Sequence, residues 1–258
     1  MKKIYFLDKY KNDIVNYIKN NTTVVDVAKI LNVPYYAVKN FMSKNNIRHK
    51  DFRFNHNFFE NIDNEEKAYW LGFLMADGCV YKKQDHYILT LSLQVGDKSH
   101  IEKFHNAIES NRNIWHCYSK GHGSFNSQHW SDKMCGDLIK LGCTPRKSLT
   151  LEFPNIKKEL LHHFIRGYFD GDGCVSFKSS NNIQIAFACG SLTFLENIKF
   201  YMELSPKIYH RPNSNCYTIV ACGNKKVFNF YKKLYSNANI YLDRKKSIFD
   251  KFFNWRLN

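Results

Sequence analysis

Trp70-Leu-Gly-Phe-Leu-Met-Ala-Asp-Gly-Cys-Val80 and Ile165-Arg-Gly-Tyr-Phe-Asp-Gly-Asp-Gly-Cys-Val175 are two versions of one stretch of sequence. In each, an apolar segment typical of a helix runs into Asp-Gly-Cys-Val. The final acids of the two versions, Asp77 and Asp172, are 95 residues apart. Because two unrelated segments would rarely agree over this length, the agreement predicts a duplicated architecture.

Small residues recur at the same offsets in both versions. Gly72 and Ala76 are four residues apart, as are Gly167 and Gly171. Residues with this spacing lie on one face of a helix. A stripe of small residues lets two helix backbones approach closely. We therefore expect the two helices to pack directly on each other.

The glycine after each acid predicts the end of its helix. Gly78 and Gly173 suit the left-handed conformation that commonly follows a helix, which puts Asp77 and Asp172 in the last turn. The carbonyl groups in the last turn of a helix carry partial negative charge, which disfavours a carboxylate there. Two adjacent carboxylates would also repel each other unless a cation lay between them. Carboxylate, carbonyl and water oxygens suit magnesium, which indicates a metal site between the repeats. The alternative is that Asp-Gly only turns each helix into a strand.

These stretches resemble the motif of the LAGLIDADG homing endonucleases, in their single-chain form with two repeats. The segment 72–78 is similar to the latter part of the motif, and the segment 167–173 is closer still. Met75 stands where the motif has its first aspartate, whereas Asp170 retains that aspartate. The earlier acid is generally not the metal ligand in the family, so this departure leaves the expected activity in place.

The resemblance also implies a site and a fold. Asp77 and Asp172 would be the catalytic acids, and the carbonyls of Ala76 and Gly171 would help them to hold Mg²⁺ or Mn²⁺. The fold class would be α+β, a pseudo-two-fold duplicated αββαββα saddle. We expect one repeat at residues 63–154 and the other at 155–258, preceded by a linker at 51–62.

The composition favours a polyanionic partner. The chain of 258 residues has a formal net charge of +15. Such an excess of basic residues is typical of nucleic-acid binding. No apolar run approaches the roughly 18 residues that a membrane span needs, and no signal peptide is recognisable, so we expect an intracellular protein. The eight cysteines include no Cys-x-x-Cys pair, which argues against a zinc finger.

Residues 1–50 are predicted to form a small all-α module of the helix-turn-helix kind. Helical patterns cover residues 14–18, 24–31 and 35–44, and Pro34 suits the start of the third helix. That helix would present to DNA the side chains of Tyr35, Tyr36, Lys39, Asn40 and Lys44. Any small three-helix bundle has a similar pattern, and the basic charge of the chain favours DNA contact.

Each repeat has the pattern helix, two strands, helix, two strands, helix. The strand over residues 87–94 alternates, with Leu89, Leu91 and Leu93 on one face. The strand over 183–188 alternates in the same way. In the resembled family such strands lie along the DNA major groove. The side chains expected to contact DNA are Thr90, Ser92, Asn126, Gln128, Gln184 and Arg211.

Two lysines are candidates for a catalytic role. Cleavage of a phosphodiester builds negative charge that a fixed cation stabilises. Lys147 and Lys245 each follow an arginine at matching places in the repeats, although Lys246 could replace Lys245. Either lysine could instead only clamp a phosphate. Gln94 resembles a family position that orients solvent, and we match it to Ala188 in the second repeat.

The resulting hypothesis is a site-specific double-strand DNA homing endonuclease, acting as a monomer and leaving short 3′ overhangs. Intron homing would be its biological setting. One alternative is a transcription regulator with an inactive copy of the fold. Another is an RNA maturase, because a basic surface serves RNA equally well.

Overall fold

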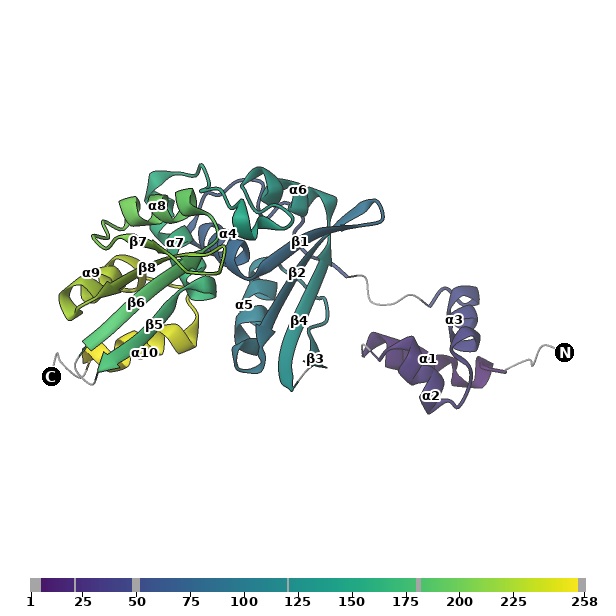
Figure 1. Cartoon of the computed structure of the whole chain (residues 1–258). Coiled ribbons are helices and arrows are strands. Elements are labelled where there is room, and N and C mark those ends of the chain that lie inside the picture. Colours follow the sequence, from purple (N-terminus) through teal and green to yellow (C-terminus); the bar gives the residue numbers. More distant parts are fainter. Residues whose placement is uncertain (1–5, 21, 48–51, 120, 180–181, 255–258) are drawn as a thin grey trace. The chain divides into compact units, whose positions relative to one another are not determined.

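The computed structural model describes residues 6–20, 22–47, 52–119, 121–179 and 182–254. Two compact units make up the chain, Met1–Arg53 and Phe54–Asn258 (Figure 1). Within the described residues, none of the helices has the length and apolar character that crossing a membrane requires.

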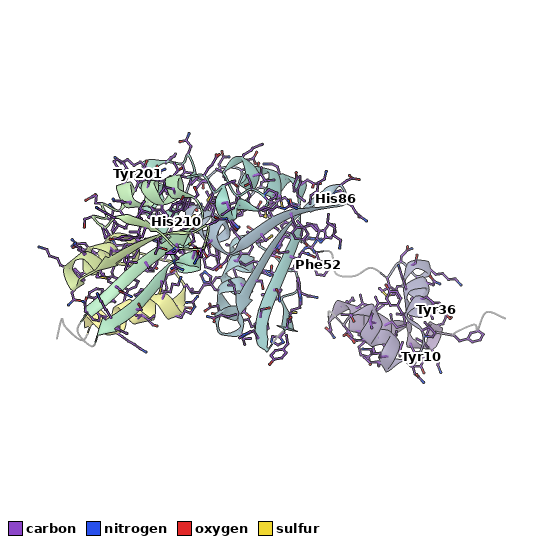
Figure 2. The ribbon with its side chains drawn as sticks, in the orientation of Figure 1. Tyr10, Tyr36, Phe52, His86, Tyr201 and His210 are labelled. Atoms are coloured by element: carbon purple, nitrogen blue, oxygen red, sulfur yellow. The ribbon has the colours of Figure 1, made fainter. Side chains whose placement is uncertain are left out.

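The first unit contains α1 (Lys11–Lys19), α2 (Val24–Ile30) and α3 (Tyr35–Lys44). Thr23 caps α2 by accepting a hydrogen bond from the backbone N–H of Asp26 at 3.1 Å. The helices enclose a core of Leu7, Ile14, Ile18, Val27, Ala28, Val38 and Met42. Tyr35 and Tyr36 at the start of α3 stay exposed, and Tyr36 projects from the surface of the unit (Figure 2).

The second unit repeats one order of elements. Its first half comprises α4 (Glu65–Ala76), β1 (Gly78–Lys83), β2 (His86–Gln94), α5 (Lys98–Ala107), β3 (Trp115–Ser119), β4 (His122–Trp130) and α6 (Asp132–Lys140). Its second half comprises α7 (Leu161–Asp172), β5 (Cys174–Ser179), β6 (Asn182–Cys189), α8 (Leu192–Tyr201), β7 (Ile208–His210), β8 (Tyr217–Cys222) and α9 (Asn224–Tyr235). The predicted duplicated αββαββα fold is confirmed.

Both halves build the same antiparallel sheet. The strand orders are β1-β2-β4-β3 and β5-β6-β8-β7. On β2, Leu89, Leu91 and Leu93 are buried against the helices, so the intervening residues form the opposite face of the sheet. After α9 the chain adds a helix that we did not predict, α10 (Asp243–Asn254), where the first half has only a short 3₁₀ turn at Lys147–Leu149.

The two halves meet through α4 and α7, which lie side by side where the sheets come together (Figure 1). A Cβ atom on Gly72 would lie 2.0 Å from the carbonyl oxygen of Phe164, and one on Gly167 would lie 1.9 Å from that of Tyr69. No side chain fits at either position. The contact is reciprocal, since Phe164 follows Tyr69 by the same 95 residues that separate the two glycines.

The prediction that Gly78 and Gly173 adopt the left-handed conformation is wrong. Gly173 is extended, with φ −75° and ψ 159°, and Gly78 has no positive φ and already belongs to β1. A Cβ on Gly173 would lie 2.5 Å from the carbonyl oxygen of Phe169, and one on Gly78 would lie 2.7 Å from that of Leu74. Glycine is therefore required because the chain passes close to the last turn of the helix it has just left.

The segment expected to be a linker, residues 51–62, also differs from the prediction, although Asp51 lies outside the described residues. Phe54, Phe58 and Phe59 are buried in the core of the second unit. Their aromatic surface leaves water by packing on the first half of that unit, so residues from 54 onward belong to the second unit.

We expect Gly72→Ala and Gly167→Ala each to lower the free energy of unfolding by about 3 kcal/mol, because the added methyl group forces α4 and α7 apart. Urea denaturation followed by circular dichroism measures this change. Gly136→Ala is the matched control, since a Cβ on this α6 glycine would meet no atom within 4 Å. The control should keep or raise the stability. Unchanged stability in the first two variants would contradict the close-packed interface.

Candidate active site

Asp77 and Asp172 come together at the ends of the paired helices. Asp77 directly follows α4, and Asp172 is the last residue of α7. The Oδ2 atom of Asp77 lies 3.3 Å from the place that a Cβ of Gly171 would occupy. The absence of a side chain at Gly171 thus leaves room for the carboxylate of the other half beside the last turn of α7.

Desolvation disfavours the ionisation of both carboxylates. Both side chains keep solvent-exposed surface, but protein surrounds them on their remaining sides. Desolvation, together with the charge of Asp172, raises the pKa of Asp77 to about 6, although Lys245, Arg244 and Lys147 act in the opposite direction. Desolvation likewise raises the pKa of Asp172. Both acids therefore bind a proton more readily than a fully hydrated aspartate does.

Lys147 and Lys245 occupy matching places. Lys147 Nζ donates a hydrogen bond to the carbonyl of Gly78, and Lys245 Nζ donates to that of Gly173, the equivalent residue of the second half. Lys246 Nζ instead contacts Asp250 at 2.7 Å. The geometry thus pairs Lys147 with Lys245 rather than with Lys246.

The two lysines nevertheless differ in what they can reach. Lys245 also donates to the carbonyls of Phe169 at 2.6 Å and Gly171 at 2.9 Å, which uses all three of its N–H donors. Its side chain is only 3% exposed, and burial lowers its pKa to about 8. Lys147 is half-buried and donates to one carbonyl. Lys245 therefore holds the end of α7, whereas Lys147 retains donors for a ligand.

The oxygen groups at the site suit a hard cation that keeps most of its water. Two carboxylates are present, and the described residues contain no group of three or more His, Cys, Asp or Glu that could hold a metal alone. Magnesium commonly binds through one or two carboxylates and completes its shell with water and phosphate. The carbonyl of Gly171 already accepts a hydrogen bond from Lys245, which leaves one lone pair for a metal. The carbonyl of Ala76 lies at the matching end of α4.

Asp170 lies two residues before Asp172 but is fully buried and outside the cluster of exposed acids. It accepts hydrogen bonds from the hydroxyls of Tyr69 at 2.8 Å and Tyr235 at 2.6 Å, and from the N–H of Leu242 at 2.7 Å. Burial raises its pKa even though these hydrogen bonds oppose the shift. Asp170 thereby ties α7 to both halves of the unit.

Gln94 lies at the end of β2, where its Nε2 atom donates to Asp97 at 3.0 Å. The prediction that Ala188 is the counterpart of Gln94 in the second half is wrong. Thr90 pairs with Cys79, and Ala186 pairs with Cys174, so the strand registers match Gln94 with Gly190.

Sequence reasoning missed Asp97 and Arg244, which form an ion pair across the two halves with a distance of 2.8 Å between Nε and Oδ2. A signal was present, because an arginine precedes each of the paired lysines.

The residues expected to contact DNA fall on several surfaces. Thr90 and Ser92 lie opposite Gln128 and Asn126 on the face of the first sheet that points away from its core. Gln184 lies on the corresponding face of the second sheet. Arg211 follows β7 and donates from Nε to Thr218 at 2.8 Å. The remaining candidates, Tyr35, Tyr36, Lys39, Asn40 and Lys44, belong to α3 of the first unit.

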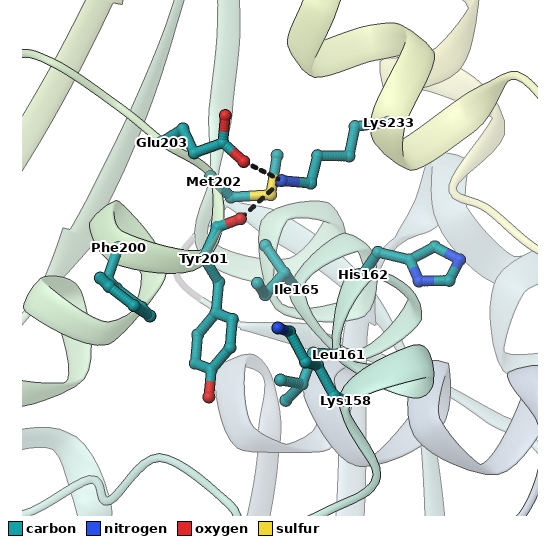
Figure 3. Close-up of a pocket in the computed structure, with 9 residues that line it drawn as sticks. All are labelled: Lys158, Leu161, His162, Ile165, Phe200, Tyr201, Met202, Glu203 and Lys233. Carbon is teal, nitrogen blue, oxygen red and sulfur yellow. Dashed lines mark hydrogen bonds and ion pairs between the residues drawn. The ribbon is translucent and has the colours of Figure 1, made fainter.

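Two hollows in the second unit contrast in character. A small cavity of about 110 Å³ lies beside Asp172 and is lined by residues that include Lys147, Ser148 and Gly190. A larger pocket of about 620 Å³ lies between α7, α8 and α9 (Figure 3). Two lysines line it, Lys158 and Lys233, and Lys233 donates to Glu203 and to the carbonyl of Tyr201. None of the predicted site residues lines the larger pocket.

Asp77→Asn is expected to stabilise the protein above pH 6. An aspartate whose pKa rises from 3.8 to about 6 on folding binds protons more tightly in the folded state, so wild-type stability falls as the pH rises from about 4 to about 6. The variant has no such loss. Urea midpoints at pH 4.5 and pH 7.5 measure the difference between the two proteins, which should grow with pH. For Asp85→Asn, in the exposed β1–β2 turn, the difference in urea midpoint from the wild type should not increase with pH.

Comparison with known proteins identifies the second half of the unit. The family model of the LAGLIDADG-like domain matches residues 159–235, from just before α7 to the end of α9. A search of curated proteins finds no match.

Similar solved structures include three endonucleases. The I-LtrWI LAGLIDADG homing endonuclease bound to target DNA is 12% identical, with 78% of this chain and 92% of that chain covered and a TM-score of 0.47. The homing endonuclease I-WcaI bound to its DNA recognition sequence is 14% identical, with 69% and 85% covered and a TM-score of 0.48. The I-SmaMI LAGLIDADG homing endonuclease bound to cleaved DNA is 12% identical, with 74% and 88% covered and a TM-score of 0.48. The family model thus assigns residues 159–235, which hold most of the second repeat, to the LAGLIDADG-like domain.

Proposed function

We propose that this chain is a site-specific double-strand DNA endonuclease that requires Mg²⁺ or Mn²⁺ and leaves short 3′ overhangs. The observation that carries the proposal is the meeting of Asp77 and Asp172, one acid from each half, beside a half-buried lysine. The net charge of +15 supports a nucleic-acid substrate. The two-fold repetition of the unit supports one cut in each of two antiparallel strands.

Each residue of the site has a distinct role in this proposal. Asp77 and Asp172 hold the divalent ion, together with the carbonyls of Ala76 and Gly171. The bound ion supplies a Lewis acid for the phosphate and lowers the pKa of a water nucleophile. Lys147 directs its remaining N–H donors at the charge that develops on the phosphate. Gln94 orients solvent on the side of the site opposite to Gly190.

DNA recognition divides between the two units. In the proposal, the outer faces of the two sheets lie along the major groove, with repeats 63–154 and 155–258 each contacting one half of the target. Thr90, Ser92, Asn126 and Gln128 provide hydrogen-bonding groups on the first sheet, and Gln184 provides one on the second. Residues 1–50 form an additional DNA-binding module that lengthens the target, with α3 as its recognition helix.

Asp77→Asn and Asp172→Asn should each reduce cleavage by roughly a hundredfold or more while DNA binding persists, because each removes a metal ligand. The assay incubates the protein with a plasmid that carries its own flanking locus, joined across the presumed insertion point, in the presence of magnesium or a chelator. The wild type should linearise the plasmid only with magnesium. Asp85→Asn is the charge-matched control and should cut normally. Tight binding without cutting by the wild type would instead indicate the regulator.

The double substitution Lys39→Ala with Lys44→Ala should reduce the salt dependence of DNA binding by about two counterions, since each phosphate contact contributes about 0.9 to the slope of log K against log salt concentration. Fluorescence anisotropy between 50 and 200 mM salt measures this slope. Lys11→Ala with Lys19→Ala on α1 removes the same charge from another helix and should change the slope less. Equal slopes in the two double variants would contradict DNA binding by α3.

A further inference from the structure

We propose that Asp97 is a positioning residue that fixes Arg244 at the edge of the catalytic centre, so that its loss slows the cleavage of one DNA strand more than that of the other. The inference rests on the proposed endonuclease function. It concerns a carboxylate from the first half of the unit and a guanidinium from the second half.

Asp97 is buried and accepts hydrogen bonds from two side chains, which distinguishes it from an acid in a surface ion pair. Its side chain is only 6% exposed. Arg244 Nε donates to Oδ2 at 2.8 Å and to Oδ1 at 3.2 Å, and Gln94 Nε2 donates to Oδ2 at 3.0 Å. Removing a buried carboxylate with two such partners leaves both of them without their acceptor. Asp97 thus holds the side chains of Arg244 and Gln94 at one carboxylate.

Asp97 makes these contacts instead of capping the helix that follows it. It immediately precedes α5, as Ser191 precedes α8, and both helices have ten residues. Ser191 caps its helix by accepting a hydrogen bond from the N–H of Phe194 at 3.3 Å. Aspartate is an equally good capping residue, yet Asp97 makes no side-chain cap. Its carboxylate is used for Arg244 and Gln94 instead.

Arg244 directly precedes Lys245, whose Nζ donates to the carbonyls of Gly171 and Gly173, the residues on either side of Asp172. In the described part of the chain the guanidinium of Arg244 donates hydrogen bonds only from Nε, and its side chain is 47% exposed. The two terminal nitrogens therefore remain for a phosphate oxygen. A guanidinium that is already held in place needs no ordering when charge develops on that phosphate.

The other half of the centre lacks this arrangement. The residue that matches Arg244 is Arg146, which is exposed, and the described residues include no ion-pair partner for its side chain. The position that matches Asp97 is Ser191, and the position that matches Gln94 is Gly190. On that side Lys147 is the cation with free donors. The two phosphates therefore meet different cations, one held by Asp97 and one not.

Strand-resolved kinetics test the inference. A cleavable duplex is labelled at its two 5′ ends with different fluorophores, and single-turnover rates of both strands are read from a denaturing gel. Asp97→Ala should slow one strand about tenfold or more and the other less than about threefold, as expected when a charge-stabilising contact is displaced. Arg244→Gln should slow the same strand. Lys147→Met should mainly slow the opposite strand.

Ser191→Ala is the matched control, because it alters the equivalent position and removes a helix cap worth about 1 kcal/mol. It should leave the ratio of the two strand rates unchanged. If Asp97→Ala does not fold, the half-exposed Arg244→Gln decides the question by itself. Equal slowing of both strands would overturn the role of Asp97 and leave the endonuclease intact. A wild type that cuts neither strand would overturn both proposals.

Discussion

The direct backbone contact between α4 and α7 is the constraint on which the rest of the structure depends. Gly72 and Gly167 leave no space for even a methyl group, so each helix lies against carbonyl groups of the other. This approach brings the ends of both helices to one place. The acids that follow the same number of residues after each glycine therefore meet, and the sheets attached to the helices are fixed relative to each other.

Bringing two helix C-termini and two carboxylates together concentrates negative charge. Basic side chains from later in each half offset part of this charge. Lys147 and Lys245 each cap a carbonyl beyond the end of a helix. Arg244 adds a third cation and is itself held by Asp97. Desolvation nevertheless raises the pKa of Asp77 and of Asp172, and at Asp77 the charge of Asp172 adds to this rise. In the proposed function, the divalent ion stabilises the ionised form of both acids.

The halves share a fold but differ in how their polar groups are buried. Asp170 is enclosed by Tyr69, Tyr235 and the backbone of Leu242, whereas the matching Met75 is an apolar core residue. Holding Leu242 in this way fixes the chain just before α10, which carries Lys245 into the interior. The duplication thus provides the frame of the site, and departures from its symmetry give the two sides different polar contacts.

The sequence by itself determined the duplication, the order of helices and strands, and the pairing of one acid and one lysine from each half, because periodicity and repeated spacing record these directly. Only the tertiary structure decided that all three N–H donors of Lys245 bind backbone carbonyls and that Asp97 pairs with Arg244. It also decided that Gly190 rather than Ala188 matches Gln94. The separation of 147 residues between Asp97 and Arg244 explains why local patterns could not show their contact. Burial and strand register are properties of the assembled chain, so they follow from packing between segments that no sequence window contains.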